Sequence, residues 1–253
     1  MEELPLSWQR PVAQVSLVLP GATESLPLVE NAVVPSRISW TDDGSLVAVQ
    51  HSGIVRVWEV ARGRVVFRAE AACLPGDGGL LTLAPDGSWV SSVWRDTMAR
   101  PDGPPLGGTV VRVWFLDGRT LTLGDPGNAP LGARAHCAAA HPDPHRVLVG
   151  WSHSVALHDL TSGTATATYR LREPADIAAS PDGTWCCVVT AHGLVEILAL
   201  PDLTPLARLR TPSHFTACSL TPAPGGFLLH ADSDRGLHTY LFRPGGPPAA
   251  HPS

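Results

Sequence analysis

Short stretches in which apolar and polar residues alternate recur along the chain, separated by turns rich in Gly, Pro, Asp and Ser. Such alternation is found at residues 54–60, 110–116, 155–160, 195–200 and 237–241. Successive side chains of a β-strand point to opposite faces, so a period of two predicts strands with one face against a core. The pattern therefore predicts an all-β protein.

Each alternating strand follows a hairpin whose turn reads Pro-Asp-Gly or a variant of it. Clear copies lie at 38–49, 83–90 and 179–186, and weaker ones at 140–147 and 220–227. Proline presets the backbone φ angle and glycine accepts a positive φ, so these residues favour a tight turn between two strands. Another turn and strand follow, which gives four strands per repeating unit.

The units recur at the interval typical of β-propeller blades, which are four-stranded sheets arranged about an axis. Asp43 and Asp86 are 43 residues apart, and Pro181 and Pro222 are 41 apart. One longer interval indicates Gly- and Pro-rich insertions at 95–109 and at 124–136. We expect five four-stranded blades, with six as the alternative.

The ends of the chain suggest how the ring closes. Residues 12–18 and 26–29 look like further strands, whereas the segment after residue 242 is rich in Pro and Gly. The last blade then lacks a fourth strand, and we expect the N-terminal strand to supply it, because closure removes an exposed sheet edge. This gives one propeller domain over 1–242 and a disordered tail over 243–253. Completion of the ring by another chain is a further hypothesis.

On these residues the chain resembles the WD-repeat family in its bacterial form, over roughly residues 12–242. The turns are similar to Ser-Pro-Asp-Gly, and the Trp-Asp position of the third strand is nearly matched by Trp58 with Glu59 and by His158 with Asp159. Later blades depart from this signature. The resemblance implies a rigid scaffold that assembles complexes or senses a ligand within larger systems.

Composition limits the partners and the compartment. The net charge is −5 with a pI near 6.1, which disfavours nucleic acid and anionic membranes because both need clustered positive charge. The N-terminus lacks the features of a secretory signal, and no stretch approaches the ~18 apolar residues of a membrane span. We expect a cytoplasmic protein. All 18 basic residues are Arg, which with abundant Gly and Pro indicates a bacterial source.

Neither the cysteines nor the histidines predict a metal centre or a cofactor. The five cysteines lack C-x-x-C spacing and are expected to be reduced, mostly buried thiols. Five histidines cluster between residues 136 and 158, but their places in the repeat point them in different directions. No motif marks a catalytic nucleophile, so we expect no enzyme activity. The alternative is a small-molecule or metal-binding propeller, possibly a hydrolase, with its site at the mouth of the central channel.

The loops between the second and third strands of the blades are the expected binding segments. Three of them carry a histidine, and another carries the insertion, which contains Trp, Met and Arg, residue types enriched at interface cores. The fold brings these loops to one face. We therefore predict a protein-binding face that includes His51, His153, His192, Trp94, Arg95, Asp96, Met98 and Arg100.

Overall fold

The computed structural model describes residues 13–18, 25–32, 37–51, 53–70, 80–95, 109–126, 134–243 and 249–250. In these ranges the regular structure consists of β-strands and one short 3-10 turn, Val60–Arg62. The all-β prediction is confirmed. Over the same ranges no helix is long and apolar enough to cross a membrane.

Twenty of the strands form five antiparallel four-stranded sheets, in each of which the strands pair in chain order. Blade 1 contains β3 (Arg37–Trp40), β4 (Leu46–His51), β5 (Ile54–Glu59) and β6 (Arg64–Glu70). Blade 2 contains β7 (Leu81–Leu83), β8 (Trp89–Arg95), β9 (Thr109–Phe115) and β10 (Thr120–Leu123). Blade 3 contains β11 (Ala135–Ala140), β12 (Arg146–Trp151), β13 (Ser154–Asp159) and β14 (Thr164–Arg170). Blade 4 contains β15 (Pro174–Ala179), β16 (Trp185–Thr190), β17 (Leu194–Ala199) and β18 (Thr204–Arg210). Blade 5 contains β19 (Phe215–Ala223), β20 (Gly226–Ser233), β21 (Gly236–Phe242) and β22 (Ala249–Ala250).

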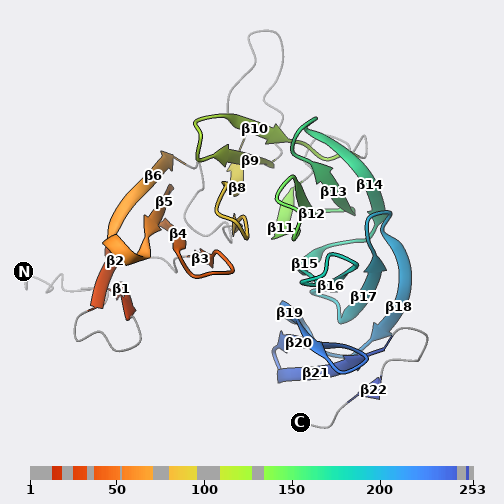
Figure 1. Ribbon diagram of the computed structural model, residues 1–253. Helices are drawn as coiled ribbons and strands as arrows, with labels where there is room; N and C mark the ends of the chain where they lie inside the picture. The colour runs from red at the N-terminus through yellow and green to blue at the C-terminus, as the bar shows by residue number, and fades with distance from the viewer. Residues whose placement is uncertain are drawn as a thin grey trace, which may run out of the picture.

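The five sheets are arranged radially, with the first strand of each blade nearest the centre (Figure 1). A central cavity of about 140 Å³ is lined by residues from β3, β7, β11, β15 and β19 or directly beside them, which places all five blades about one axis. The prediction of a five-bladed propeller is therefore confirmed.

The turn between the first and second strands is held by its aspartate. In blade 1, Asp43 Oδ1 accepts hydrogen bonds from the Ser45 backbone N–H at 2.9 Å and from the Thr41 hydroxyl at 2.8 Å. Asp86 and Asp182 accept the corresponding backbone bonds in blades 2 and 4. The glycine after each of these aspartates has a positive φ, for example +68° at Gly44, as the sequence pattern predicts.

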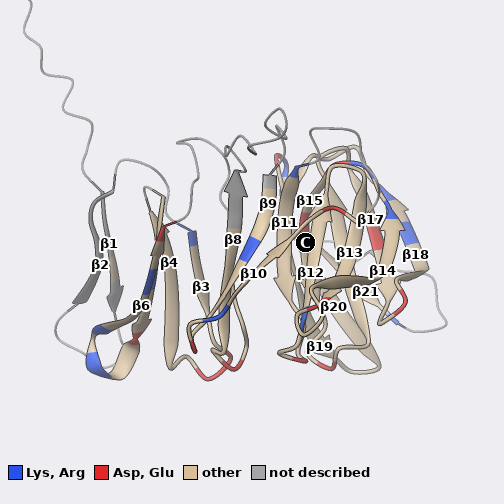
Figure 2. Cartoon of the chain, turned by 90° about the horizontal axis from the view of Figure 1, so that it is seen from above, with Lys and Arg blue, Asp and Glu red and all other residues tan. Residues whose placement is uncertain are grey.

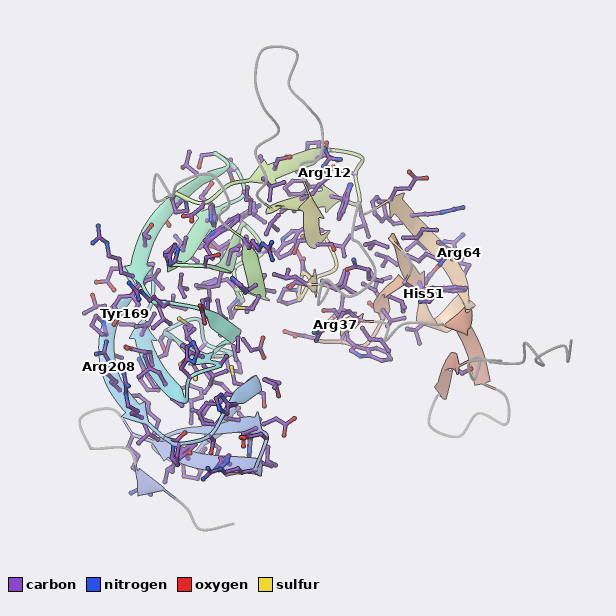
Figure 3. The ribbon with its side chains drawn as sticks, turned by 180° about the vertical axis from the view of Figure 1, so that it is seen from behind. Arg37, His51, Arg64, Arg112, Tyr169 and Arg208 are labelled. Carbon is purple, nitrogen blue, oxygen red and sulfur yellow. The ribbon has the colours of Figure 1, made fainter. Side chains whose placement is uncertain are left out.

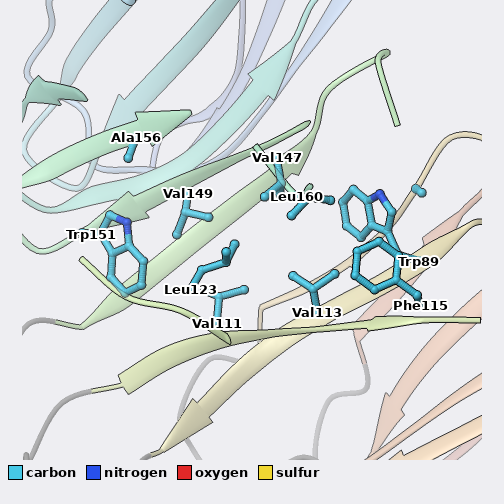
Figure 4. Close-up of a cluster of buried hydrophobic side chains, with 11 residues drawn as sticks. Trp89, Val111, Val113, Phe115, Leu123, Val147, Val149, Trp151, Ala156 and Leu160 are labelled. Carbon is cyan, nitrogen blue, oxygen red and sulfur yellow. The ribbon is translucent and has the colours of Figure 1, made fainter. Parts of the chain in front are cut away.

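Apolar layers between adjacent blades form the core. Between blades 2 and 3, for instance, Trp89, Val111 and Val113 face Val147 and Val149 (Figure 4). The Trp89 indole N–H also donates to the Pro144 carbonyl of blade 3 at 2.6 Å. Similar layers join blades 1 and 2, blades 3 and 4, and blades 4 and 5. Each blade is thus stabilised mainly by its neighbours, because burial of apolar area is the dominant favourable contribution to folding.

A buried carboxylate joins blades 3 and 4 near their outer strands. Glu196 of β17 is fully buried and accepts hydrogen bonds from Arg208 Nε at 2.6 Å and from the Tyr169 hydroxyl at 3.0 Å. Arg208 also donates to the Tyr169 oxygen at 3.1 Å, and the two side chains lie side by side on the outer rim (Figure 3). The charge of Glu196 is therefore paired, as a buried carboxylate requires.

The predicted closure by the N-terminal strand is wrong. β1 (Ala13–Val18) pairs with β2 (Ser25–Ala32) in a separate two-stranded sheet, and β2 lies against β4 of blade 1. The fourth strand of blade 5 is β22, which lies in the segment expected to be disordered. Pairing with a strand that is near in sequence costs less chain entropy than reaching the far end of the ring, which favours the hairpin.

His158 occupies the Trp position of the third strand in blade 3, where it is 2% exposed beside Trp151. Neither ring nitrogen has a hydrogen-bond partner among the described residues. Burial lowers the pKa of His158 to about 4, so the folded protein holds this imidazole neutral in mildly acidic solution.

We expect this histidine to make the fold acid-sensitive. As the pH falls below 6.5, the unfolded chain takes up the proton before the folded one, so stability decreases until the pH reaches about 4. Between pH 7.5 and pH 5 the loss from this group amounts to about 2 kcal/mol. Urea denaturation at the two pH values should show that His158→Phe reduces the pH-dependent loss by about this amount. An equal loss in wild type and variant would contradict the assignment.

Candidate partner-binding face

Two sets of loops emerge on the face where the second strand of each blade ends, which we call the upper face (Figure 2). One set connects second to third strands, and the other connects each fourth strand to the next blade. His51 ends β4, while His153 and His192 lie in the corresponding loops of blades 3 and 4. The prediction that the fold brings these loops to one face thus agrees with the topology.

The predicted site residues are only partly brought together. His153 and His192 are exposed on neighbouring blades, whereas half-buried His51 lies on blade 1 (Figure 3). Trp94 and Arg95 are the last residues of β8, where their backbones pair with Val110 and Thr109. The side chains of Trp94 and Arg95, and the whole of Asp96, Met98 and Arg100, lie outside the described residues.

Glu173 connects the upper loops of blades 3 and 4. Its backbone N–H donates to the Ser152 carbonyl at 3.0 Å, and its carboxylate Oε2 lies 2.6 Å from His192 Nε2. The residue has a φ of 50°, a left-handed conformation that is uncommon outside glycine. Contacts on both sides of Glu173 hold this conformation in place.

Hydrogen bonds between loops also join blade 4 to blade 5. His214, in the loop between β18 and β19, hydrogen-bonds through Nδ1 to the Ala191 carbonyl of the blade 4 loop. Its backbone N–H donates to Asp234 Oδ1 at 2.9 Å, and the Asp234 N–H donates to the His214 carbonyl at 3.2 Å. The loops of blades 4 and 5 are therefore joined by both backbone and side-chain bonds.

On blade 3 the corresponding contacts are made by Ser152. Its hydroxyl accepts a hydrogen bond from the Arg134 backbone N–H at 3.0 Å and lies 3.2 Å from His136 Nε2. Burial lowers the pKa of His136, and the nearby Glu173 carboxylate opposes that effect. We call this series of connected residues across blades 3 to 5 the upper belt; it comprises Arg134, His136, Ser152, Glu173, Ala191, His192, His214 and Asp234.

Close packing of these loops requires glycine at position 193. Gly193 has a φ of +78°, and a Cβ atom there would lie within 2.6 Å of the Ser213 carbonyl oxygen and closer still to that of Thr211. The Thr211 N–H donates to the Gly193 carbonyl at 2.8 Å. The loop that carries His192 is therefore fixed against the next connection of the chain.

Sequence reasoning found His192 but missed most of the upper belt. Glu173, His214 and Asp234 belong to no repeat motif, and the contacts that they make join different blades. The sequence signal that could have drawn attention to them is their place in loops on the same face as His192.

The opposite, lower face carries the acidic turns (Figure 2). Backbone hydrogen bonds from Ser45, Arg119 and Ser162 lower the pKa values of Asp43, Asp117 and Asp159 respectively. These aspartates are ionised at neutral pH, and arginines accompany the acidic groups on this face, for example Arg119 beside Asp117 and Arg146 beside Asp143.

Four ionisable residues, Arg37, His136, Cys137 and Asp176, line the central cavity. Its one described carboxylate is Asp176, whose Oδ2 accepts the Cys218 N–H of blade 5 at 2.8 Å; burial raises the pKa of Asp176, and nearby Arg37 opposes this. Burial also raises the pKa of the Cys137 thiol, which is a poor nucleophile when protonated. The volume of about 140 Å³ is below that of typical small-molecule sites.

The clustered histidines of blade 3 are dispersed by the fold. His136 and His153 lie on the upper face, His141 accepts a hydrogen bond from the Asp143 N–H in a lower turn, and His158 is buried between blades. In the part of the chain that the structure describes, no group of three His, Cys, Asp or Glu side chains is placed to hold a metal ion.

Comparison with known proteins supports the fold. No family model matches the chain, and no curated protein matches it in sequence. Among solved structures it is similar to the β-propeller domain of Cps50 (Swd1) from Myceliophteria thermophila, with a TM-score of 0.61 and 16% identity. The match covers 82% of this chain and 65% of that one, so the chain spans less than two thirds of the matched protein. At this identity the likeness establishes the β-propeller fold alone.

Proposed function

We propose that this protein is a non-catalytic interaction module that binds a protein partner through the upper face of blades 3 to 5. The upper belt carries this proposal, because it joins loops from three blades into one hydrogen-bonded surface. Loops that are already ordered lose little conformational entropy on binding, so more of the contact energy becomes affinity.

The chemistry of the face suits a protein partner. Arg172, Arg235 and His153 are exposed near the belt, so cationic, anionic and neutral hydrogen-bonding groups occur together. Mixed polar groups of this kind are typical of the rim of protein interfaces. β8 ends on the same face of the propeller, and we include Trp94, Arg95, Asp96, Met98 and Arg100 in the proposed contact.

A catalytic role in the central channel has less support. The Asp176 carboxylate is engaged with the Cys218 backbone, and the Cys137 thiol is buried and protonated. The small volume of the cavity also disfavours a metabolite. We therefore propose a cytoplasmic scaffold or sensor that needs no cofactor, and keep a channel ligand as the second candidate.

A matched pair of double variants tests the binding face. His192 and Glu173 form a hydrogen-bonded pair on the upper face with side chains 67% and 57% exposed, and Arg119 and Asp117 form an ion pair on the lower face with side chains 67% and 56% exposed. In affinity purification with quantitative mass spectrometry, Glu173→Ala with His192→Ala should reduce recovery of the partner at least tenfold. Asp117→Ala with Arg119→Ala should leave recovery unchanged. Loss of the partner with the lower variant alone would refute the proposed face.

Preorganisation of the belt can be measured separately by hydrogen exchange. Asp234→Ala removes the acceptor of the His214 N–H, so exchange at that amide should become roughly tenfold faster, as expected for loss of one hydrogen bond. Asp232→Ala, a change at an exposed carboxylate near the end of β20, serves as the control and should leave His214 unaffected. Unchanged exchange in Asp234→Ala would show that the belt does not order this loop.

A further inference from the structure

Four arginines of the lower face are paired with carboxylates. Each lies within 3.4 Å of an aspartate or a glutamate of the same turn, and they are Arg62, Arg64, Arg119 and Arg146. An ion pair of this kind weakens the attraction of a guanidinium group for other anions, because the opposite charge is already adjacent. Little of their positive charge is therefore available to a partner.

The arginines on the upper face of blades 3 to 5 lack such partners. Arg134 precedes β11, Arg172 follows β14, and Arg235 lies in the turn between β20 and β21. Arg170 and Arg210 are the last residues of β14 and β18. All five are exposed, and among the described residues none of them forms an ion pair. We call these five residues the upper arginines.

Two of the upper arginines occupy the same position in neighbouring blades. Arg170 in blade 3 and Arg210 in blade 4 each pair, in the backbone register, with the first residue of the third strand of their blade. In blade 1 the corresponding position is occupied by Glu70. Basic segments lie near the upper ends of β14 and β18 (Figure 2). The positive charge at this position therefore belongs to blades 3 and 4 and is not a feature of every repeat.

The carboxylates of the same loops are fewer, and two of them are engaged. Glu173 Oε2 lies 2.6 Å from His192 Nε2, and Asp234 Oδ1 accepts the His214 N–H at 2.9 Å. A third carboxylate, Asp232, is exposed near the end of β20. The upper arginines outnumber these carboxylates, so the surface carries an excess of positive charge although the whole chain has a net charge of −5.

Carboxylates of a protein are the anionic groups that suit this surface. A guanidinium group is planar, stays charged and binds a carboxylate through two parallel hydrogen bonds. It is also less strongly hydrated than an ammonium group, so less water has to be displaced when a pair forms. A nucleic acid strand fits less well, because it carries a phosphate at every nucleotide and would meet Glu173 and Asp232 as well as the arginines.

We propose that the partner presents an acidic segment, rich in Asp or Glu, to the upper arginines of blades 3 to 5. Arg170, Arg172 and Arg210 lie in or beside the connections between these blades, next to the upper belt, and pair with the carboxylates of the segment. This inference rests on the proposed function, because it specifies the chemistry of the partner that binds the same face.

A peptide of about ten residues with alternating Glu and Ser is a suitable probe for the full-length protein. Titrated to about 1 mM, which reaches weak affinities, it should bind saturably at low salt. It should bind at least fivefold more tightly than the same peptide with Gln in place of Glu, and added NaCl should weaken its binding, since exposed ion pairs are screened. Equal binding of the two peptides, or the absence of saturable binding, would overturn the proposal.

A matched pair of arginine variants locates the contact. Arg170→Gln with Arg210→Gln removes two positive charges from the upper face, and Arg64→Gln with Arg119→Gln removes two from the lower face, where these side chains are 61% and 67% exposed. The upper variant should bind the Glu peptide at least fivefold more weakly, and the lower variant should bind it as the wild type does. Equal weakening in both variants would show a general effect of net charge and would overturn the proposal.

Two further probes separate a protein segment from other anionic partners. A single-stranded oligonucleotide with the same number of charges as the peptide should bind at least fivefold more weakly than the Glu peptide, and so should vesicles that contain phosphatidylserine. Binding of the oligonucleotide or of the vesicles as tight as that of the peptide would assign the surface to nucleic acid or to a membrane and would overturn the proposal.

Affinity purification distinguishes failure of this proposal from failure of the proposed function. Recovery of the partner should decrease at least fivefold with Arg170→Gln and Arg210→Gln, as well as with Glu173→Ala and His192→Ala. Loss of the partner with the Glu173 and His192 variant alone would leave the upper face as the binding face and overturn its acidic partner. Full recovery with both variants would overturn the binding face as well.

Discussion

The apolar contact between neighbouring blades is the constraint on which the rest of the molecule depends. A four-stranded sheet has two faces, and within the described chain the inner blades bury both of them against adjacent blades. Trp89 shows how strict the fit is, since its ring fills the layer between blades 2 and 3 while its N–H reaches a carbonyl of the next blade. A blade removed from this series would expose an apolar face, so the repeat is stable only as an array.

The two ends of the array meet this constraint in different ways. At blade 1 a two-stranded hairpin lies against the outer face, with β2 beside β4. At blade 5 the outer face carries polar side chains beside the exposed Leu237: His230 hydrogen-bonds to Thr221 and Thr239 on the neighbouring strands, and Asp232 is exposed on the same side. Polar outer faces are also how terminal repeats of other arrays remain compatible with water.

The upper and lower faces differ in the range of their hydrogen bonds. On the lower face, Asp43 and Asp182 bond to groups within two residues of themselves, so each turn is stabilised locally. On the upper face, the bonds of Glu173 and His214 join residues that are about twenty positions apart and belong to different loops. A substitution in a lower turn therefore changes only the hydrogen bonds of that turn, whereas the upper loops are joined into one surface. For this reason we place the proposed partner contact on the upper face.

The sequence by itself determined the blades, because strand alternation and Pro-Asp-Gly turns depend on nearest neighbours along the chain. Gly44 and Gly183 have the positive φ that the pattern predicts, and even the degenerate turn at Asp143 forms the expected bond to the His145 N–H. Tertiary structure alone decided the pairing of β1 with β2, the position of β22 and the joining of Glu173 to His192. These depend on which distant segments meet in space, and periodicity along a chain carries no information on that choice.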